Sequence, residues 1–441
     1  MRSALVYAAI ASLFLTGFKF AFGPVDLYLH YLYMPAIILA GIVVNRTVVG
    51  LPLAALLAGL AVHALFAVAL FGSPPARAVL QLAVLAGTFV MFHQILALAG
   101  GDVFRIMRAY MRLAAAAALI GLVQVAAFLA GIRAGYDFSR FIPDFALHVN
   151  ELGIIRAQSI FKEPSHLGQI LAPAIFVAVL NLVSARPVFV GRRLSAVIVA
   201  VALLSFSTVG YTAIFASVSL VALNLRRGAA AWALVVGVVL AVGLYSHVPE
   251  FKIRVDDTIG ALLYNDLFRA NFSTLTLYNN LHVTLAHLAE TRFWGGGLGS
   301  HLSAFERHSV LYGFSGLPFQ IAYLNAEDAN SLLLRILSEL GLPGLVGFAA
   351  FLWFGYLGRR TASGPGRTGD GGASGDGSPY WIVSNAALVL FLVALLRQGH
   401  YANFGVPLFM LVYVRAAIAG RRAEAAAASG VPPSRPAGST A

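Results

Sequence analysis

Apolar runs of about 20 residues, separated by short polar segments, repeat along most of this 441-residue chain. A run of that length can cross the hydrocarbon core of a bilayer as one helix. Counting such runs gives about twelve expected spans. They cover approximately residues 4–22, 26–45, 49–71, 77–99, 111–131, 168–185, 194–209, 211–225, 229–247, 331–357, 380–397 and 402–419. The pattern therefore predicts an all-α polytopic membrane protein.

Arginine is concentrated in every second connection between the expected spans. These connections carry Arg46, Arg105, Arg108, Arg112, Arg186, Arg192, Arg193, Arg226, Arg227, Arg359, Arg360, Arg367, Arg421 and Arg422. The short connections on the other side carry little beyond Arg77 and Arg397. Because basic residues are retained on the cytoplasmic side, the first set is expected to be cytoplasmic, as are both termini.

Residues 1–423 are expected to form a single membrane domain. On the outer side it has two long loops, residues 132–167 and residues 248–330, the second of which follows the ninth span. The larger loop contains helix-like and aromatic stretches, so we expect it to be folded. The Gly/Ser-rich segment 361–378 and the tail 424–441 are expected to be flexible and cytoplasmic.

Composition narrows the class of protein further. The chain is 59% hydrophobic with a mean hydropathy of +0.83, which excludes an ordinary soluble domain. It contains no cysteine, which excludes disulfides, thiolate metal sites and a cysteine nucleophile. The formal net charge of +12 lies mostly in the short connections, so it indicates membrane topology and no nucleic-acid partner.

Charged residues next to membrane spans are costly and are therefore functional candidates. The first candidate stretch lies directly before the sixth span and contains Arg156, Lys162, Glu163 and His166. Pro164 predicts that a helix begins within it. The alternative interpretation is an ordinary charged loop end.

The second candidate region is the large outer loop. Its charged and ionisable residues include Arg254, Asp256, Asp257, Arg269, His282, His287 and Arg292. The glycine run Phe293-Trp-Gly-Gly-Gly-Leu-Gly-Ser300 follows them, but the strand that a dinucleotide-binding turn requires does not precede it. The run is either a plain turn or a loop whose backbone N–H groups approach an anion.

Three shorter polar stretches complete the set of candidates. Asp328 or Asn330 is placed to cap the helix of the tenth span. Within that helix Arg335 and Glu339 are four residues apart, so they share a face and can form a structural ion pair. The fourth stretch is Arg397-Gln-Gly-His-Tyr401, and the fifth is Ser205-Phe-Ser-Thr-Val-Gly-Tyr211, interpreted as a tight or a re-entrant turn.

The first, third and fourth stretches are all expected at the outer membrane face, together with the large loop. Several arginines with one or two carboxylates suit a phosphate-bearing amphiphile, because guanidinium groups grip phosphate oxygens in bidentate fashion. A carboxylate or histidine there can act as general base for an attacking hydroxyl.

These motifs, in this order, resemble the O-antigen ligase and polymerase superfamily, the polytopic proteins that assemble bacterial surface polysaccharides. The resemblance runs from about Leu152 to Tyr401. It rests on the Phe-Lys-Glu-Pro-Ser segment after Arg156, the turn that ends at Gly210, the glycine run, the Asp328-Ala-Asn-Ser-Leu segment and the Arg397 motif.

The resemblance implies a metal-independent glycosyltransferase without a cofactor, in the bacterial inner membrane, with its active site facing the periplasm. Its substrates would be undecaprenyl-diphosphate-linked oligosaccharides, and membrane lipids, a chain-length regulator and a flippase are the further partners considered. Ligases of this superfamily carry a His-Asn pair before the third-last span. Because this chain has Ala329-Asn330 there, we expect a polymerase.

The residues expected to act divide into three groups. Glu163 is the first candidate for the general base, followed by Asp328 and His166. The expected ligands of the diphosphate are Arg156, Arg269, Arg292 and Arg397. The remaining expected substrate contacts are Lys162, Asn330, Arg335, His400 and Tyr401.

Two other functions fit parts of the pattern. A ligase would transfer a finished glycan to a lipid or protein acceptor. A transporter of lipid-linked oligosaccharides also fits twelve spans, but transporters commonly have repeated halves and midplane charges. Here the charges gather at one face and the two halves differ, so the polymerase is the function we expect.

Overall fold

The computed structural model describes residues 2–22, 25–143, 145–150, 152–224, 235, 237–239, 241–243, 245–247, 249–263, 271–313, 323–359 and 379–429. Its first elements are α1 (Arg2–Ala11), η1 (Ser12–Phe14), β1 (Lys19–Phe22), β2 (Val25–Tyr28), α2 (Leu29–Asn45), α3 (Leu51–Phe71), α4 (Pro75–Leu98), α5 (Val103–Leu129), η2 (Arg133–Gly135) and α6 (Pro164–Val183). The rest are α7 (Arg192–Leu204), α8 (Thr208–Asn224), α10 (Pro249–Leu263), α11 (Phe272–Glu290), α12 (His301–His308), η3 (Val310–Gly313), α14 (Leu332–Gly355), α15 (Tyr380–Leu396) and α16 (Val406–Ala428).

The fold is predominantly helical, as the apolar pattern predicts. Five of the described helices, α3, α4, α5, α6 and α14, are long and apolar enough to cross a membrane. Shorter apolar helices cover the expected spans at 26–45, 211–225 and 380–397. Within the expected span 229–247, residues 229–234, 236, 240 and 244 lie outside the described residues. So do the segment 361–378 and the tail from residue 430, whereas α16 continues through Ala428.

The prediction of one continuous first span over residues 4–22 is wrong. The α-helix ends at Ala11, and after the short η1 turn the strands β1 and β2 pair antiparallel, with Lys19 opposite Tyr28. A Cβ at Gly17 would lie 2.8 Å from the Ile160 carbonyl oxygen, so the chain packs too closely there for any side chain. Among the described residues, β1 and β2 are therefore the exception to an otherwise helical fold.

Helix α6 occupies the centre of the bundle. It packs against α7, α8 and α15, and most of its residues are buried. A Cβ at Gly168 would lie 2.8 Å from the Gly210 backbone nitrogen, so α6 and α8 approach closely at this point. The start of α6 is therefore held rigidly beside the turn that connects α7 to α8.

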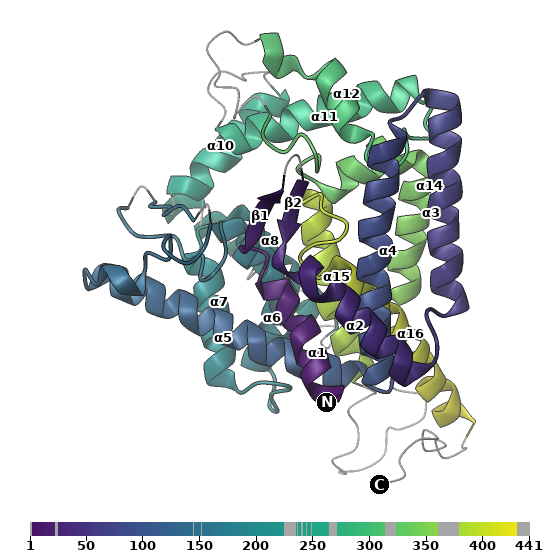
Figure 1. Cartoon of the computed structure of the whole chain (residues 1–441). Coiled ribbons are helices and arrows are strands. Elements are labelled where there is room, and N and C mark those ends of the chain that lie inside the picture. The colour runs from purple at the N-terminus through teal and green to yellow at the C-terminus, as the bar shows by residue number, and fades with distance from the viewer. Residues whose placement is uncertain are drawn as a thin grey trace.

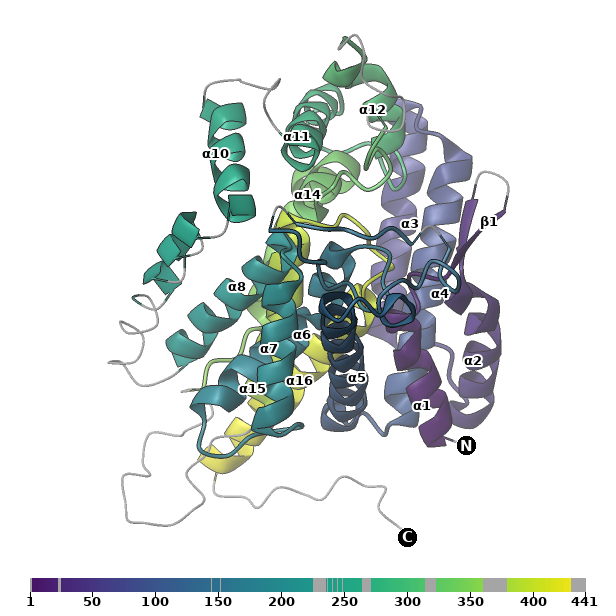
Figure 2. The same ribbon diagram turned by 90° about the vertical axis from the view of Figure 1, so that its left-hand side faces the viewer.

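The helices α10, α11 and α12 lie across one end of the bundle (Figures 1 and 2). The start of α1 and the end of α16 lie at the opposite end in both views. These three helices fall within the stretch 248–330, where the sequence indicates a folded loop.

Substitution of Gly168 tests the close approach of α6 and α8. In Gly168→Ala the new methyl group meets backbone atoms that cannot rotate away, so we expect destabilisation by about 1–3 kcal/mol. The measurement is thermal unfolding of the purified protein in detergent. The matched control is Gly59→Ala in α3, where a Cβ meets no atom within 4 Å. Equal melting temperatures for the two variants would contradict the packing described.

Candidate functional site

Three stretches that are far apart in the sequence meet at the start of α6. We call Glu163, His166, Asp328 and His400 the carboxylate–histidine cluster. The Phe404 ring joins its parts, with its centroid 4.9 Å from that of His166 and 5.8 Å from that of His400. His400 Nε2 lies 3.1 Å from Asp328 Oδ2. The structure thus brings residues of the first, third and fourth stretches together.

Glu163 is the N-cap residue of α6, which begins at Pro164 as predicted. The Ser165 hydroxyl donates to Glu163 Oε2 over 2.9 Å. Burial raises the pKa of Glu163, but the positive charges of His166, His148 and Lys162 and the Ser165 hydrogen bond together lower it below its ordinary value. The carboxylate is therefore ionised at neutral pH, in the state that accepts a proton.

Two side chains on the first turns of α6 have polar atoms without a hydrogen-bond partner among the described residues. They are His166, through Nδ1, and Gln169, through both Nε2 and Oε1. Gln169 is fully buried. Because unpaired buried polar groups are costly, their position beside Glu163 indicates a place where water or a polar ligand binds.

The turn that carries Asp328 is held by its own side chain and by the neighbouring turn. Asp328 Oδ1 accepts from the Asn330 N–H over 3.0 Å and from Asn325 Nδ2 over 3.1 Å. Asn330 has a left-handed backbone with φ of 56°, and its carbonyl accepts from the Gln398 N–H. The predicted cap of α14 is wrong, however. Ser331 is the N-cap residue instead. Its backbone is extended directly before the helix, and its hydroxyl accepts from the Leu334 N–H.

Arg335 and Glu339 form the predicted ion pair on α14. The distance between Arg335 Nε and Glu339 Oε1 is 3.2 Å, and both side chains are buried. Arg335 Nη1 also donates to the Gly399 carbonyl over 3.0 Å, and the guanidinium lies 4.6 Å from the centroid of the Tyr401 ring. Arg335 therefore holds the 397–401 turn against α14.

The basic residues expected to bind diphosphate are placed differently from one another. Arg156 donates to the Ser205 and Phe206 carbonyls of the turn between α7 and α8, over 3.2 and 2.8 Å. This turn is short, since α7 ends at Leu204 and α8 begins at Thr208. Arg397 Nη1 donates to the backbone and side-chain oxygens of Ser273, at the start of α11. Lys162 is half-buried directly before Glu163.

Of the remaining two expected arginines, Arg292 is described and is not brought to the cluster. Arg292 is exposed and follows the last residue of α11, whereas Arg397 binds near the first residue of that helix. A helix of this length separates its two ends by about 28 Å. Arg269 lies outside the described residues, as does the side chain of Arg254.

Two N–H groups of the glycine run donate to backbone carbonyls, so these two groups are not available to bind an anion. Gly296 N donates to the Ser338 carbonyl over 3.0 Å, and Gly297 N donates to the Glu339 carbonyl over 2.7 Å. These carbonyls precede a break in α14 at Gly341, whose φ is 64°. The glycine run therefore satisfies backbone carbonyls that the break in α14 leaves unpaired within the helix.

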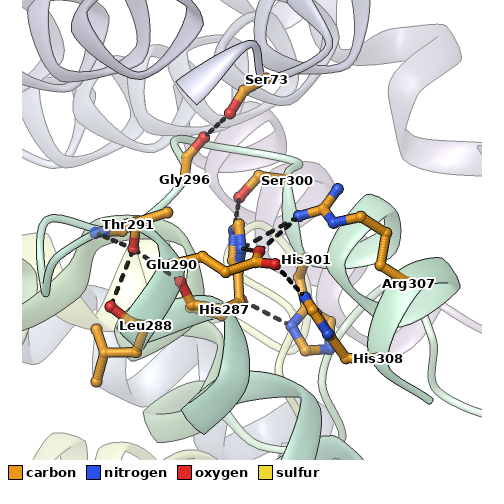
Figure 3. Close-up of polar contacts among 12 residues, drawn as sticks. Ser73, His287, Leu288, Glu290, Thr291, Gly296, Ser300, His301, Arg307 and His308 are labelled. Atoms are coloured by element: carbon orange, nitrogen blue, oxygen red, sulfur yellow. Dashed lines mark hydrogen bonds and ion pairs between the residues drawn. The ribbon is translucent and has the colours of Figure 1, made fainter. Parts of the chain in front are cut away.

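A second polar group, which the sequence did not reveal as a unit, lies between α11 and α12 (Figure 3). His287 Nε2 is 3.3 Å from Ser300 Oγ, and His287 Nδ1 is 3.5 Å from Glu290 Oε2. Arg307 and His308 bind the same Glu290 carboxylate over 3.2 and 2.9 Å. Burial lowers the pKa of His287, although Glu290 opposes this effect.

The order serine, histidine, carboxylate is that of a hydrolytic triad. Ser300 is only 2% exposed, however, and Gly296 fills the space in front of His287 Nε2. The Ser73 hydroxyl in turn donates to the Gly296 carbonyl. Ser300 is therefore not accessible as a nucleophile, and the group joins α11, α12 and the glycine run.

His301 is a further buried histidine that sequence reasoning missed. Its ring nitrogens lie 2.9 Å from Ser338 Oγ and 2.9 Å from Asn280 Oδ1. Burial lowers its pKa to about 3, so the ring is neutral. In the sequence, His301 is simply a histidine that follows the glycine run, and no motif marks it as a candidate.

Comparisons of the chain with models of known protein families and with curated proteins find no match.

The Arg335–Glu339 pair permits a test of what holds the 397–401 turn in place. Glu339→Leu should destabilise the protein by about 3–5 kcal/mol, because it leaves a buried guanidinium without its counter-charge. The double variant Arg335→Met with Glu339→Leu should recover much of that loss. The measurement is the melting temperature of the native protein, Glu339→Leu and the double variant in one detergent. A double variant less stable than Glu339→Leu would refute this account.

Proposed function

We propose that this protein is a polysaccharide polymerase. It would transfer a growing glycan from undecaprenyl diphosphate to the non-reducing end of a new lipid-linked repeat unit. The observation that carries the proposal is the meeting of Glu163, His166, Asp328 and His400 at one end of the helix bundle. The motif resemblance described above supplies the substrate class and remains part of the proposal.

A long apolar cleft supports a substrate with a lipid tail. The cleft has a volume of about 790 Å³ and runs between α3, α4, α14 and α16. Along α14 its lining extends from Leu332 to Phe351, which corresponds to about 28 Å. Tyr401 lines the same cleft and directly follows His400 of the cluster. A prenyl chain in this cleft would place its diphosphate close to the cluster.

The proposed reaction is a substitution at the anomeric carbon of the growing chain. A hydroxyl oxygen of the incoming unit forms the new bond, and its proton passes to the Glu163 carboxylate. The bond from the anomeric carbon to the diphosphate oxygen breaks, and undecaprenyl diphosphate leaves with the electron pair. Asp328, held by His400, is the second candidate for the base.

The basic side chains near the start of α6 would offset the charge of the leaving diphosphate. Arg156, Lys162 and Arg397 are the residues assigned this role. Arg292 is not assigned to it, because the length of α11 separates it from Arg397. Because the leaving group is already activated, positioning and electrostatic stabilisation would supply most of the rate. The proposal needs no metal or cofactor.

The finer topology belongs to the same proposal. Twelve spans, with both termini in the cytoplasm, would put the cluster and α10 to α12 at the periplasmic face of the inner membrane. The arginine distribution supports this orientation. The start of α1 and the end of α16 lie together at the end of the bundle opposite α10 to α12, which agrees with it (Figure 1).

Substitution of the proposed base tests the activity. Purified protein is mixed with a synthetic undecaprenyl-diphosphate repeat unit in a chelating buffer, and the products are separated on a gel. We expect a ladder of longer glycans from the native protein. Glu163→Gln should lower the rate about 100-fold or more, because general base catalysis contributes at least that much. Glu306→Gln changes a half-exposed carboxylate outside the cluster, whose contact with Arg77 is 3.8 Å long, and should retain the native rate within about twofold.

The products also separate the proposal from its competitors. Transfer to a second acceptor lipid without a ladder would establish a ligase and refute the polymerase. Movement of labelled lipid-linked sugar across liposome membranes, without any transfer, would establish a transporter. An unchanged ladder in Glu163→Gln would remove Glu163 from the reaction.

The pH dependence of the rate tests the same residue independently. The base must be deprotonated, and the pKa of Glu163 lies below its ordinary value of about 4.5. The rate should therefore stay level as the pH is lowered through 6 and 5 and should fall only below about 4.5. The measurement is the initial rate at saturating substrate in a series of buffers. A fall centred near pH 6.5 would contradict Glu163 as the base.

A further inference from the structure

A small basic pocket lies between α1 and α5, away from the carboxylate–histidine cluster. Its volume is about 220 Å³. Its walls are Ser3, Val6, Tyr7, Arg105, Arg108, Ala109 and Arg112. The three arginines are spaced three and four residues apart on α5, so they share one face of that helix. This face meets α1 along its first two turns.

The charge within this pocket is poorly balanced. Arg105 Nη2 donates to Ser3 Oγ over 2.7 Å, and Arg112 Nη1 donates to the Tyr7 hydroxyl over 2.6 Å. Both acceptors are neutral. Arg108 Nη2 lies 3.8 Å from Asp102 Oδ2, a weak contact between two half-exposed side chains.

Asp102 cannot neutralise the pocket by itself. Its Oδ1 caps α5 by accepting from the Phe104 and Arg105 backbone N–H groups, over 2.8 and 3.2 Å. Among the described residues, Asp102 is the acidic side chain that contacts these guanidinium groups, and it does so through Arg108. The hydroxyl groups on α1 hold two of these guanidinium groups in fixed orientations, which reduces the entropy lost when an anion binds.

The position of the pocket relates it to the membrane surface. Helix α5 begins at Val103 and is one of the five helices long and apolar enough to cross a membrane. The pocket occupies its first three turns, where the apolar helix emerges from the bilayer. The pocket is lined by Ser3, Val6 and Tyr7 in the first turns of α1. Helix α1 begins at the end of the bundle opposite α10 to α12 (Figures 1 and 2).

We infer that this pocket binds the phosphate of an anionic membrane lipid. Guanidinium groups bind phosphate oxygens in bidentate fashion, and basic pockets between membrane helices recognise such headgroups. Val6 and Ala109 give the pocket an apolar wall that suits the glycerol backbone of a phospholipid. The inference does not depend on the glycosyltransferase activity proposed above.

The test is lipid binding to the purified full-length protein by native mass spectrometry. Three probes are added separately: phosphatidylglycerol, phosphatidylcholine with the same acyl chains, and inorganic phosphate. We expect phosphatidylglycerol to be retained about tenfold more tightly than phosphatidylcholine. Arg105→Gln with Arg112→Gln should reduce this preference to near unity. The matched control, Arg193→Gln with Arg422→Gln, removes the same charge from exposed positions outside the pocket and should keep it.

A second variant separates loss of binding from loss of fold or topology. Arg105→Lys with Arg112→Lys keeps the positive charges but loses the planar pair of donors, so the preference should fall to an intermediate value. Equal retention of the two lipids by the native protein would overturn the inference. So would a preference that survives in both the Gln and the Lys variants. Inorganic phosphate bound as tightly as phosphatidylglycerol would assign the pocket to a soluble anion and overturn the lipid as its source.

Discussion

The break in α14 at Gly341 is the constraint on which the arrangement of the site depends. A helix interrupted inside an apolar segment leaves backbone groups that a bilayer cannot solvate. The glycine run 293–300 satisfies them, because Gly296 and Gly297 donate to carbonyls before the break and Leu342 donates back to the Phe293 carbonyl. Gly341 itself packs against the backbone of this run, so neither segment could take this form without the other.

The consequences of this contact extend along α14 to the cluster. The half of the helix before the break carries Arg335, which binds the Gly399 carbonyl and packs against the Tyr401 ring. Gly399 packs directly against the backbone of Asp328, where a side chain would not fit. The next residue, His400, therefore meets the Asp328 carboxylate. A buried ion pair thus positions a turn, and the turn positions the histidine.

What the sequence predicted correctly was mostly local. Pro164 marks a helix start wherever the rest of the chain lies, and the spacing of Arg335 and Glu339 places them on one face of any helix. The features that were missed depend on distant partners. The turn at Gly17 is fixed by the Ile160 carbonyl, and the partners of the glycine run lie about 40 residues further along the chain. The distance of Arg292 from the cluster followed only from the length and direction of α11.

The buried polar residues fall into two kinds. Some have a hydrogen-bond partner for every polar atom and stabilise the fold, whereas others have unpaired polar atoms that can bind water or a ligand. His301 is deeply buried, but both ring nitrogens have partners, so it stabilises the contact between α11, α12 and α14. Gln169 is as deeply buried and has no partner for its amide among the described residues. Such a group costs about 1–3 kcal/mol when it is left unpaired. Gln169 lies within one turn of His166, whose Nδ1 is also unpaired among the described residues, so a water or a polar ligand between them would offset that cost.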